Sequence, residues 1–342
     1  MVLLLAVAAG SLEGCAGRSG AAGRRETGKV IRVGYFPNIT HAQVLVGVAR
    51  GAFQERLGPE TGVEFKVLNA GPSAIEALFA GELDLVYIGP NPAVNGYVRS
   101  GGQALRVVAG GASGGASLVV RGNLPITRPA DFRGRRIASP QLGNTQDVAL
   151  RWWLKEQGLG LKGEGGDVEV IPVKNPDQLA LFLKQEIDAA WTVEPWVSRL
   201  VREGGGRVFL DERELWPEGK FVTTNLVASS RFLREEPGLL KKWLQAHVEL
   251  TLWIQGNPAA ARELVNRELE RLTGKPLSRE VLEDSFSRLE ITYDPVRESL
   301  FSSADRAYEL GFLGRERPDL SAIYDLTLLN QVLIEKGLTT GG

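Results

Sequence analysis

Short apolar runs rich in β-branched residues alternate along the chain with segments in which apolar positions recur every three to four residues. The first pattern predicts buried strands, and the second predicts amphipathic helices. Because the two alternate, we expect an α/β protein with parallel strands, crossover helices and two sheets. The expected strands are Val30–Phe36, Glu64–Leu68, Leu83–Ile88, Leu105–Ala109, Ser117–Arg121, Arg136–Ser139, Glu169–Val173, Ala189–Val193, Val208–Leu210 and Asn225–Ala228.

The helical pattern fills the gaps between these strands and then takes over the chain, with no further strand expected after Pro237. Residues that often cap helices, Thr40, Ser73, Asn144 and Asp177, stand close to four of the helix starts. The expected helices are Ala42–Glu55, Ser73–Ala80, Pro92–Ser100, Thr145–Gln157, Gln178–Gln185, Gly238–Gln255, Ala259–Leu272, Arg279–Leu289, Val296–Leu310 and Asp325–Glu335.

Five loops follow the carboxyl ends of predicted strands, at 37–41, 70–73, 89–92, 142–146 and 192–196, and all combine small residues with hydroxyl or amide side chains. In open α/β sheets, ligands bind beyond these strand ends, where helix N-termini present unpaired N–H groups. Glycine lets the backbone approach a ligand closely, and Ser, Thr, Asn and Gln donate hydrogen bonds without a permanent charge. The loops therefore predict a site for a small anion with several oxygens, such as a sulfonate or nitrate.

The N-terminal segment predicts export. The apolar run Val2–Ala9 precedes Leu12-Glu13-Gly14-Cys15, which resembles the lipobox of bacterial lipoproteins. We expect a signal peptide at 1–14, acylation of Cys15 and a flexible tether at 15–29, so that a lipid anchor is the protein's link to the membrane. Glu13 is unusual for a lipobox and no Lys or Arg precedes the apolar run, which suggests a translation start further upstream.

Composition narrows the class of protein further. The 342 residues are 43% hydrophobic, enough for a large core, and the length favours two lobes over one. With 40 basic and 41 acidic residues the net charge is −1, so no long-range field would attract nucleic acid, and none is expected as a partner. The single cysteine forms no internal disulfide.

Signatures of catalysis are absent from the sequence. It contains no G-x-S-x-G elbow and no Walker loop, and its two histidines, His41 and His247, are far apart. The glycine-rich stretch 110–115 lies between two predicted strands, with no helix to direct at a phosphate. We therefore expect a binding protein and not an enzyme, with no metal and no cofactor.

The tryptophans divide into two groups. Four lie within helical apolar stripes and are expected in the core: Trp152, Trp153, Trp243 and Trp253. Trp191 and Trp196 flank the turn at Glu194-Pro195, where they could either wall a ligand cleft or pack between the lobes.

Several motifs together resemble the nitrate/sulfonate/taurine class of ABC-transporter solute-binding proteins, especially the aliphatic sulfonate-binding branch. They are Arg32–Asn38, Ala70–Ser73, Gly143–Asp147, Glu194–Trp196, Trp216-Pro217 and Asn257–Ala259, and the likeness extends from about residue 29 to 332. The resemblance implies a type II periplasmic-binding-protein fold, with two doubly wound α/β lobes that close over a ligand about a two-strand hinge. Lobe one would comprise 30–116 plus 229–342, and lobe two 117–228. A permease and ATPase complex would be the partner, and the protein would be a monomer in the periplasm or at the cell surface.

The resemblance also transfers a set of ligand contacts onto this sequence. In lobe one and near the hinge they are Asn38, Thr40, His41, Gly71, Pro72, Ser73, Gly89, Pro90, Asn91, Ser113 and Gly114. In lobe two and the returning strand they are Asn144, Thr145, Gln146, Trp191, Glu194 and Thr224.

The solute itself is left open by the sequence. Taurine would need an acid for its ammonium group, for which Glu194 or Asp147 could serve, whereas an alkanesulfonate would need an apolar wall such as Trp191 or Tyr35. A thiamine-pyrimidine or aromatic carboxylate would instead stack on Trp191 and Trp196. A remote alternative is an enzyme similar to the thiamine-pyrimidine synthases, which carry a cysteine-rich motif that this chain lacks.

Overall fold

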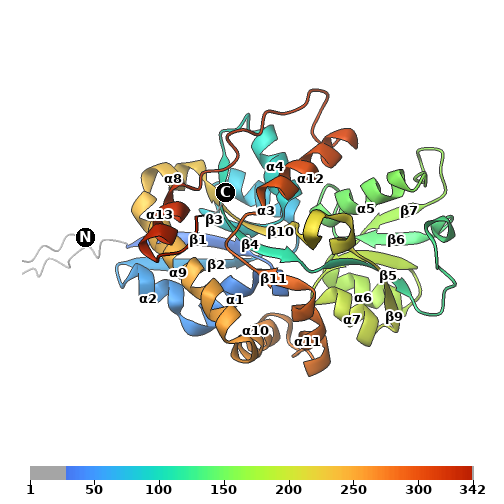
Figure 1. Cartoon of the computed structure of the whole chain (residues 1–342), viewed down its shortest axis with the longest axis horizontal. Helices are drawn as coiled ribbons and strands as arrows, with labels where there is room; N and C mark the ends of the chain where they lie inside the picture. The colour runs from blue at the N-terminus through green and yellow to red at the C-terminus, as the bar shows by residue number, and fades with distance from the viewer. Residues whose placement is uncertain (1–27, 341–342) are drawn as a thin grey trace, which may run out of the picture.

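The computed structural model describes residues 28–340, which form two α/β lobes side by side (Figure 1). The signal peptide, Cys15 and nearly all of the tether expected from the sequence lie outside the described residues. The tether was expected to end at residue 29, but Lys29 is already the first residue of the first strand.

Lobe one is built on a six-stranded sheet in the order β11-β4-β10-β3-β1-β2. β1, β2 and β3 run parallel, and β10 lies antiparallel between β3 and β4. Its strands are β1 (Lys29–Tyr35), β2 (Thr61–Val67), β3 (Leu85–Ile88), β4 (Leu105–Gly114), β10 (Val222–Ser229) and β11 (Leu289–Ile291).

Most helices pack on the two faces of this sheet. On one face Phe53 stacks on Trp243, with ring centroids 3.8 Å apart. The helices are α1 (Ala42–Arg50), α2 (Ala52–Leu57), α3 (Gly71–Phe79), α4 (Pro90–Arg99), α8 (Ser230–Glu235), α9 (Pro237–Gly256), α10 (Pro258–Thr273), α11 (Arg279–Ser287), α12 (Arg297–Glu309) and α13 (Thr327–Glu335), with the 3-10 turn η1 (Ile39–His41) before α1.

Lobe two is the smaller lobe and has a five-stranded sheet in the order β7-β6-β8-β5-β9, in which β5 is antiparallel to both neighbours. The strands are β5 (Ala116–Arg121), β6 (Arg136–Ser139), β7 (Glu169–Pro172), β8 (Ala189–Val193) and β9 (Gly206–Asp211). The helices are α5 (Thr145–Glu156), α6 (Asn175–Leu183) and α7 (Trp196–Arg202), with 3-10 turns η2 (Pro129–Phe132), η3 (Glu212–Leu215) and η4 (Pro217–Gly219).

Two connections join the lobes. β4 passes into β5 through Gly114 and Gly115, whose φ angles of 76° and 78° are left-handed and favour glycine. A Cβ atom on Gly114 would also lie 2.7 Å from the carbonyl oxygen of Arg288. The chain returns from β9 through η3 and η4 to β10. The C-terminal part of the chain then bridges the lobes again, because α11 packs on α7 and α12 packs on α5.

Two expectations from the sequence were wrong. The helix expected over Ala42–Glu55 breaks at Gly51, whose φ of 68° ends α1 before α2 begins. The rule that strands end before Pro237 also fails, because the residues after α11 form β11 on the edge of β4. A strand of three residues is too short for its sequence pattern to be distinguished from the end of the preceding helix.

Candidate functional site

A narrow pocket with a cavity volume of about 20 Å³ lies between the lobes, at the carboxyl ends of strands from both sheets. None of the described residues that line it is a Lys, Arg, Asp or Glu. The lining residues are Phe36, Asn38, Thr40, His41, Asn69, Ala70 and Gly89 from lobe one, Asn144, Thr145, Gln146, Asn175 and Val193 from lobe two, and Thr223 and Thr224 from β10.

Helix N-termini meet at this pocket, and the N–H groups that their first turns carry are uncapped; α3, α4 and α6 each also have a proline there, which carries no N–H. α3, α4, α5 and α6 all begin at or next to lining residues, and none of the four has a side chain that accepts from its first turn. α8 and α11 begin away from the pocket, and there Ser229 and Ser278 cap the first turn through their hydroxyl oxygens. Unpaired N–H groups and the positive ends of helix dipoles favour an anion, so the pocket attracts negative charge without a charged side chain.

Thr145 of lobe two and Gly89 of lobe one lie opposite each other across the pocket. Thr145 is buried at the start of α5, and its hydroxyl oxygen has no hydrogen-bond partner among the described residues. Gly89 precedes α4, and a Cβ atom there would overlap that hydroxyl. A buried hydroxyl without a partner is costly, which makes Thr145 a ready donor to a bound solute.

His41 contributes a neutral ring to the pocket. Complete burial lowers its pKa to about 3, so the imidazole is uncharged at neutral pH. The Phe36 backbone N–H donates to Nδ1 at 3.4 Å, an assignment that leaves the ring proton on Nε2 as a donor. Asn38 contacts the other lobe, because its Oδ1 accepts from Trp196 Nε1 at 3.1 Å.

The structure brings eight of the residues expected from the sequence together around this pocket: Asn38, Thr40, His41, Gly89, Asn144, Thr145, Gln146 and Thr224. It does not place the other nine in the lining. Gly71 and Pro90 are the first residues of α3 and α4, and each follows a lining residue. Pro72 is the second residue of α3.

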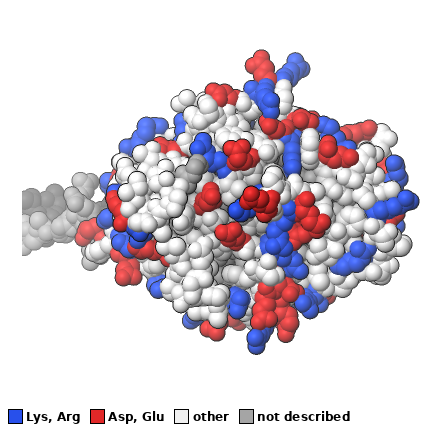
Figure 2. Space-filling model, viewed as in Figure 1, with Lys and Arg blue, Asp and Glu red and all other residues white. Residues whose placement is uncertain are grey.

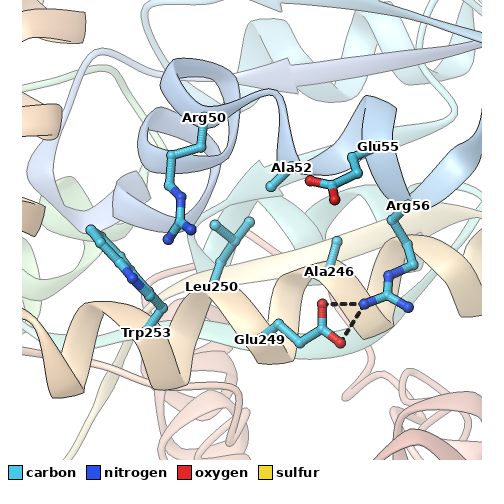
Figure 3. Close-up of a pocket in the computed structure, with 8 residues that line it drawn as sticks. All are labelled: Arg50, Ala52, Glu55, Arg56, Ala246, Glu249, Leu250 and Trp253. Carbon is cyan, nitrogen blue, oxygen red and sulfur yellow. Dashed lines mark hydrogen bonds and ion pairs between the residues drawn. The ribbon is translucent and has the colours of Figure 1, made fainter.

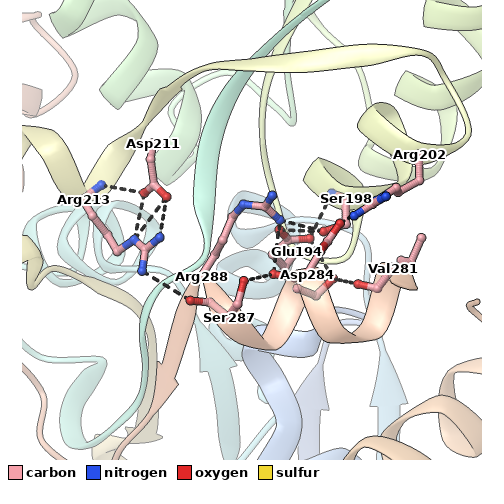
Figure 4. A network of polar contacts seen from close by, with 10 residues as sticks. Glu194, Ser198, Arg202, Asp211, Arg213, Val281, Asp284, Ser287 and Arg288 are labelled. Carbon is pink, nitrogen blue, oxygen red and sulfur yellow. Dashed lines mark hydrogen bonds and ion pairs between the residues drawn. The ribbon is translucent and has the colours of Figure 1, made fainter. Parts of the chain in front are cut away.

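Glu194 has a different role from the ligand contact expected. Its buried carboxylate lies in a network that crosses from lobe two to α11 (Figure 4). It accepts from the Ser198 backbone N–H and hydroxyl, from Ser285 Oγ at 2.9 Å and from Arg288 Nη1 at 2.9 Å. Burial raises the pKa of Glu194, and the charge of Arg288 and the hydrogen bonds oppose that shift. The carboxylate is fully engaged and does not face the pocket.

Trp191 is likewise wrong as a cleft wall. Its side chain is completely buried in the core of lobe two, and its Nε1 donates to Glu212 Oε2 at 2.7 Å. Trp191 shares its face of β8 with the lining residue Val193, but it lies two residues further from the carboxyl end of the strand, within the core of lobe two. Asp147, the other acid considered for an ammonium group, is held by Ser139, the Gly143 N–H and Arg151.

The remaining four expected residues serve local structure. Ser73 is exposed and donates to the carbonyl of Ala70 at 2.9 Å. Asn91 is buried against α12, where it exchanges two hydrogen bonds with Ser303. Ser113 Oγ accepts from the Phe221 N–H at 3.3 Å, and Gly114 forms the left-handed hinge described above.

Six lining residues were missed by the sequence analysis: Phe36, Asn69, Ala70, Asn175, Val193 and Thr223. Asn175 could have been found, because Asn175-Pro176 follows the predicted strand Glu169–Val173 in the same way as the five loops that were considered. Phe36, Asn69, Ala70, Val193 and Thr223 adjoin or lie within the expected motifs and carry no separate signal.

A larger hollow lies on the outer face of lobe one, between α1, α2 and α9 (Figure 3). Glu249 on α9 pairs there with Arg56, and the Arg50 guanidinium lies over Trp253, 4.2 Å from the ring centroid. Acidic and basic side chains are also interspersed over the face shown in Figure 2. No helix within residues 28–340 is long and apolar enough to cross a membrane, and no group of three potential metal ligands occurs in that range.

Two α/β lobes with a site between them define the class of periplasmic binding proteins. The chain belongs to the NMT1-like family, whose model matches residues 25–268. Among solved structures, it resembles the alkanesulfonate-binding protein SsuA of Xanthomonas axonopodis pv. citri bound to MOPS, with a TM-score of 0.70, 20% identity, and coverage of 86% of this chain and 98% of that one. The nitrate-binding protein NrtA of Synechocystis PCC 6803 has a TM-score of 0.75 at 14% identity, covering 90% of this chain and 89% of that one.

The curated relatives include both binding proteins and an enzyme. A putative binding protein of Brucella abortus is 25% identical over 74% of this chain and 78% of the relative. The taurine-binding periplasmic protein of Escherichia coli is 24% identical over 63% of this chain and 65% of the relative. The 2'-hydroxybiphenyl-2-sulfinate desulfinase of Rhodococcus erythropolis, an enzyme, is 27% identical over 45% of this chain and 54% of the relative.

Proposed function

We propose that this protein is the extracytoplasmic solute-binding component of an ABC importer and captures a small aliphatic sulfonate between its lobes. The observation that carries the proposal is the neutral pocket on which four uncapped helix N-termini converge. Partial charges on N–H groups bind an anion with three oxygens while avoiding the fixed ion pair that would slow release. The alkanesulfonate-binding and nitrate-binding neighbours support the same class of ligand.

Two features favour an alkyl sulfonate over taurine and nitrate. Taurine carries an ammonium group, and the acids considered for it, Glu194 and Asp147, are engaged elsewhere. Nitrate has no apolar part, whereas Phe36 and Val193 give the pocket two apolar side chains. An aromatic solute is disfavoured because neither tryptophan that was expected to stack on it lines the pocket. Trp191 is in the core of lobe two, and Trp196 donates to Asn38.

We propose that the protein binds its solute without transforming it. Its single cysteine, Cys15, is the proposed site of acylation, and residues 28–340 contain no thiol nucleophile. Burial also keeps both histidines neutral, since it lowers the pKa of His41 to about 3 and that of His247 to about 4. Incubation with 2'-hydroxybiphenyl-2-sulfinate should release no sulfite, and multiple turnovers would overturn this part of the proposal.

The cellular setting is proposed from the sequence and the family together. Acylated Cys15 would tether a monomer outside the cytoplasm, where its lobes could dock on a permease and ATPase complex. Labelling with a radioactive fatty acid should mark the full chain and should not mark Cys15→Ser. Release of an unlabelled wild-type protein into the medium would contradict the tether.

Calorimetry and thermal shift with a panel of solutes test the ligand class. The panel contains methanesulfonate, ethanesulfonate, taurine, nitrate and a thiamine-pyrimidine. A sulfonate at about 100 times its dissociation constant should add about 2.7 kcal/mol to the free energy of unfolding. We expect the alkanesulfonates to bind more tightly than taurine and nitrate. No stabilisation by any sulfonate would overturn the proposal.

A further inference from the structure

The start of α7 in lobe two, with the turn that precedes it, holds the loop 36–41 of lobe one by two hydrogen bonds. The backbone N–H of Ile39 donates to the carbonyl oxygen of Glu194 at 3.2 Å. Trp196 Nε1 donates to Asn38 Oδ1 at 3.1 Å. Both Trp196 and Asn38 are buried, so water competes little for this second bond. The Asn38 side chain is therefore oriented from the opposite lobe.

The bond from Trp196 also fixes which end of the Asn38 amide is left for the pocket. An indole N–H can only donate, so the amide atom that it contacts is the oxygen. Asn38 lines the pocket, and within residues 28–340 its Nδ2 donates to no protein atom. The amide therefore offers the site its N–H donors, because its oxygen is already engaged.

His41, three residues further along the same loop, is oriented by the same principle. The Phe36 backbone N–H can only donate, and its contact with Nδ1 leaves the ring proton on Nε2. Two side chains that could each donate or accept are thus presented as donors alone. An anion with several oxygens can accept from both, whereas a solute that brings its own N–H group sets a donor against a donor.

We propose that Trp196 is a positioning residue that sets specificity: by holding the Asn38 oxygen, it makes the pocket select a sulfonate over the neutral sulfonamide of the same shape. This role rests on the proposed function, with a sulfonate in the pocket. A sulfonamide has an NH2 group in place of one sulfonate oxygen, so it donates where the sulfonate accepts. Binding it leaves buried donors unpaired, and sites of this kind discriminate strongly. Trp196 lies outside the described lining and acts through Asn38.

Calorimetry with methanesulfonate and methanesulfonamide on the full-length protein measures this selectivity. Methanesulfonate is the smallest member of its class, so it requires the least widening of the narrow pocket. The wild type should bind it at least about 100-fold more tightly than the sulfonamide. In Trp196→Phe the Asn38 amide is free to rotate and to accept from the sulfonamide. The ratio of the two affinities should then fall at least about tenfold, the factor that one hydrogen bond to an anion corresponds to.

Two variants of Asn38 separate positioning from packing. In an Asn38→Ala background no amide remains to be oriented, so adding Trp196→Phe should change the ratio by less than about twofold. Lost packing alone would lower both affinities in either background and leave the ratio unchanged. Asn38→Asp keeps the bond from Trp196 but turns an acceptor toward the pocket, so it should also lower the ratio at least about tenfold, whether or not Trp196→Phe folds.

Trp253→Phe is the matched control, because an arginine lies over Trp253 as Arg199 lies over Trp196, but on the outer face of lobe one. It should leave both affinities within about twofold of the wild type. A smaller wild-type margin, a smaller fall in Trp196→Phe or Asn38→Asp, or the same fall in the Asn38→Ala background would overturn the role of Trp196 while methanesulfonate binding still supported the proposed function. Failure of every sulfonate to bind the wild type would overturn both.

Discussion

Arg288 Nη1 lies 2.9 Å from Glu194 Oε1 and so joins the end of α11 in lobe one to the loop before α7 in lobe two (Figure 4). Glu194 is fully buried, and Arg288 also donates to Ser198 Oγ at 2.9 Å. The pair therefore links the two lobes in the form that the structure shows. Sequence motifs singled out Glu194 as a ligand contact, whereas its hydrogen bonds run to Ser198, Ser285 and Arg288.

Arg288→Met should weaken solute binding and destabilise the closed protein. Removing one partner leaves the buried Glu194 charge uncompensated, a loss of about 3–5 kcal/mol in comparable pairs. We expect at least a tenfold rise in the dissociation constant for the preferred sulfonate, measured by calorimetry, because closure now costs more. Glu194→Gln combined with Arg288→Met should recover part of the loss, since the buried charge is then absent.

A nearby exposed pair provides the control. Arg202 Nε and Asp284 Oδ2 lie 2.7 Å apart and join the same two helices, but the Arg202 side chain is half exposed. Exposed pairs contribute about 0–1 kcal/mol, so Arg202→Met should leave solute affinity within about threefold of the wild type. Equal effects of Arg202→Met and Arg288→Met would contradict the role given to burial.

Glu212 should make stability depend on pH. Burial raises its pKa from 4.5 to about 7, opposed by hydrogen bonds from Trp191 and Trp216. A folded-state pKa above the unfolded value favours the protonated form, so this contribution is complete below about pH 4.5 and is lost as the pH rises to about 7. Glu212→Gln cannot ionise, so the wild type should lose roughly 2–3 kcal/mol relative to it between about pH 5 and about pH 8. Urea unfolding of both proteins measures this difference, and a pH-independent difference would contradict the assignment.

The sequence predicted most of the fold because strands and helices carry their own periodicity. All ten expected strands are present, and two, Arg136–Ser139 and Ala189–Val193, have the expected bounds. The missed pieces are short or depend on tertiary contacts. β11 is held by pairing with β4, and α7 begins behind the Glu194-Pro195 turn, where the pattern is interrupted.

The loops that line the candidate pocket were predicted more accurately than the directions of their side chains. Sequence motifs locate the loops, but the direction of each side chain depends on its contacts with the opposite lobe and with the C-terminal helices. Glu194 turns toward Arg288, which is 94 residues away, and Asn91 turns toward Ser303, 212 residues away. Neither partner carries a motif. The expected cap residues also do not cap their helices, which leaves the N–H groups available at the pocket.

Thr145→Ala should reduce solute affinity without harming the empty protein. Its hydroxyl has no partner among the described residues, so the variant loses no internal hydrogen bond. A donor lost to an anion corresponds to about 1.5–3 kcal/mol, or roughly a 10- to 100-fold rise in the dissociation constant. Thr145→Ser keeps the donor and should retain most of the affinity. Calorimetry gives the dissociation constants, and normal binding by Thr145→Ala would show that the pocket is wrongly placed.

Gly89→Ala should block closure while sparing each lobe. The φ of Gly89 is −68° and its ψ is 161°, an ordinary extended conformation for alanine, so the open protein should tolerate the change. In the closed form the added Cβ would overlap Thr145 Oγ1 from the opposite lobe. We expect at least a tenfold loss of solute affinity, with the melting temperature of the unliganded protein within a few degrees of the wild type.

The double variant Gly89→Ala with Thr145→Ala separates this clash from any general damage. Removing the Thr145 hydroxyl relieves the overlap, although its Cβ would still lie 3.3 Å from the new methyl group. The two losses of affinity should therefore be less than additive, a coupling that residues in contact show and distant residues lack. Gly238→Ala places a methyl group in α9 where no atom lies within 4 Å, and it should bind solute normally. Additive losses in the double variant would mean that Gly89 and Thr145 do not meet when the solute is bound.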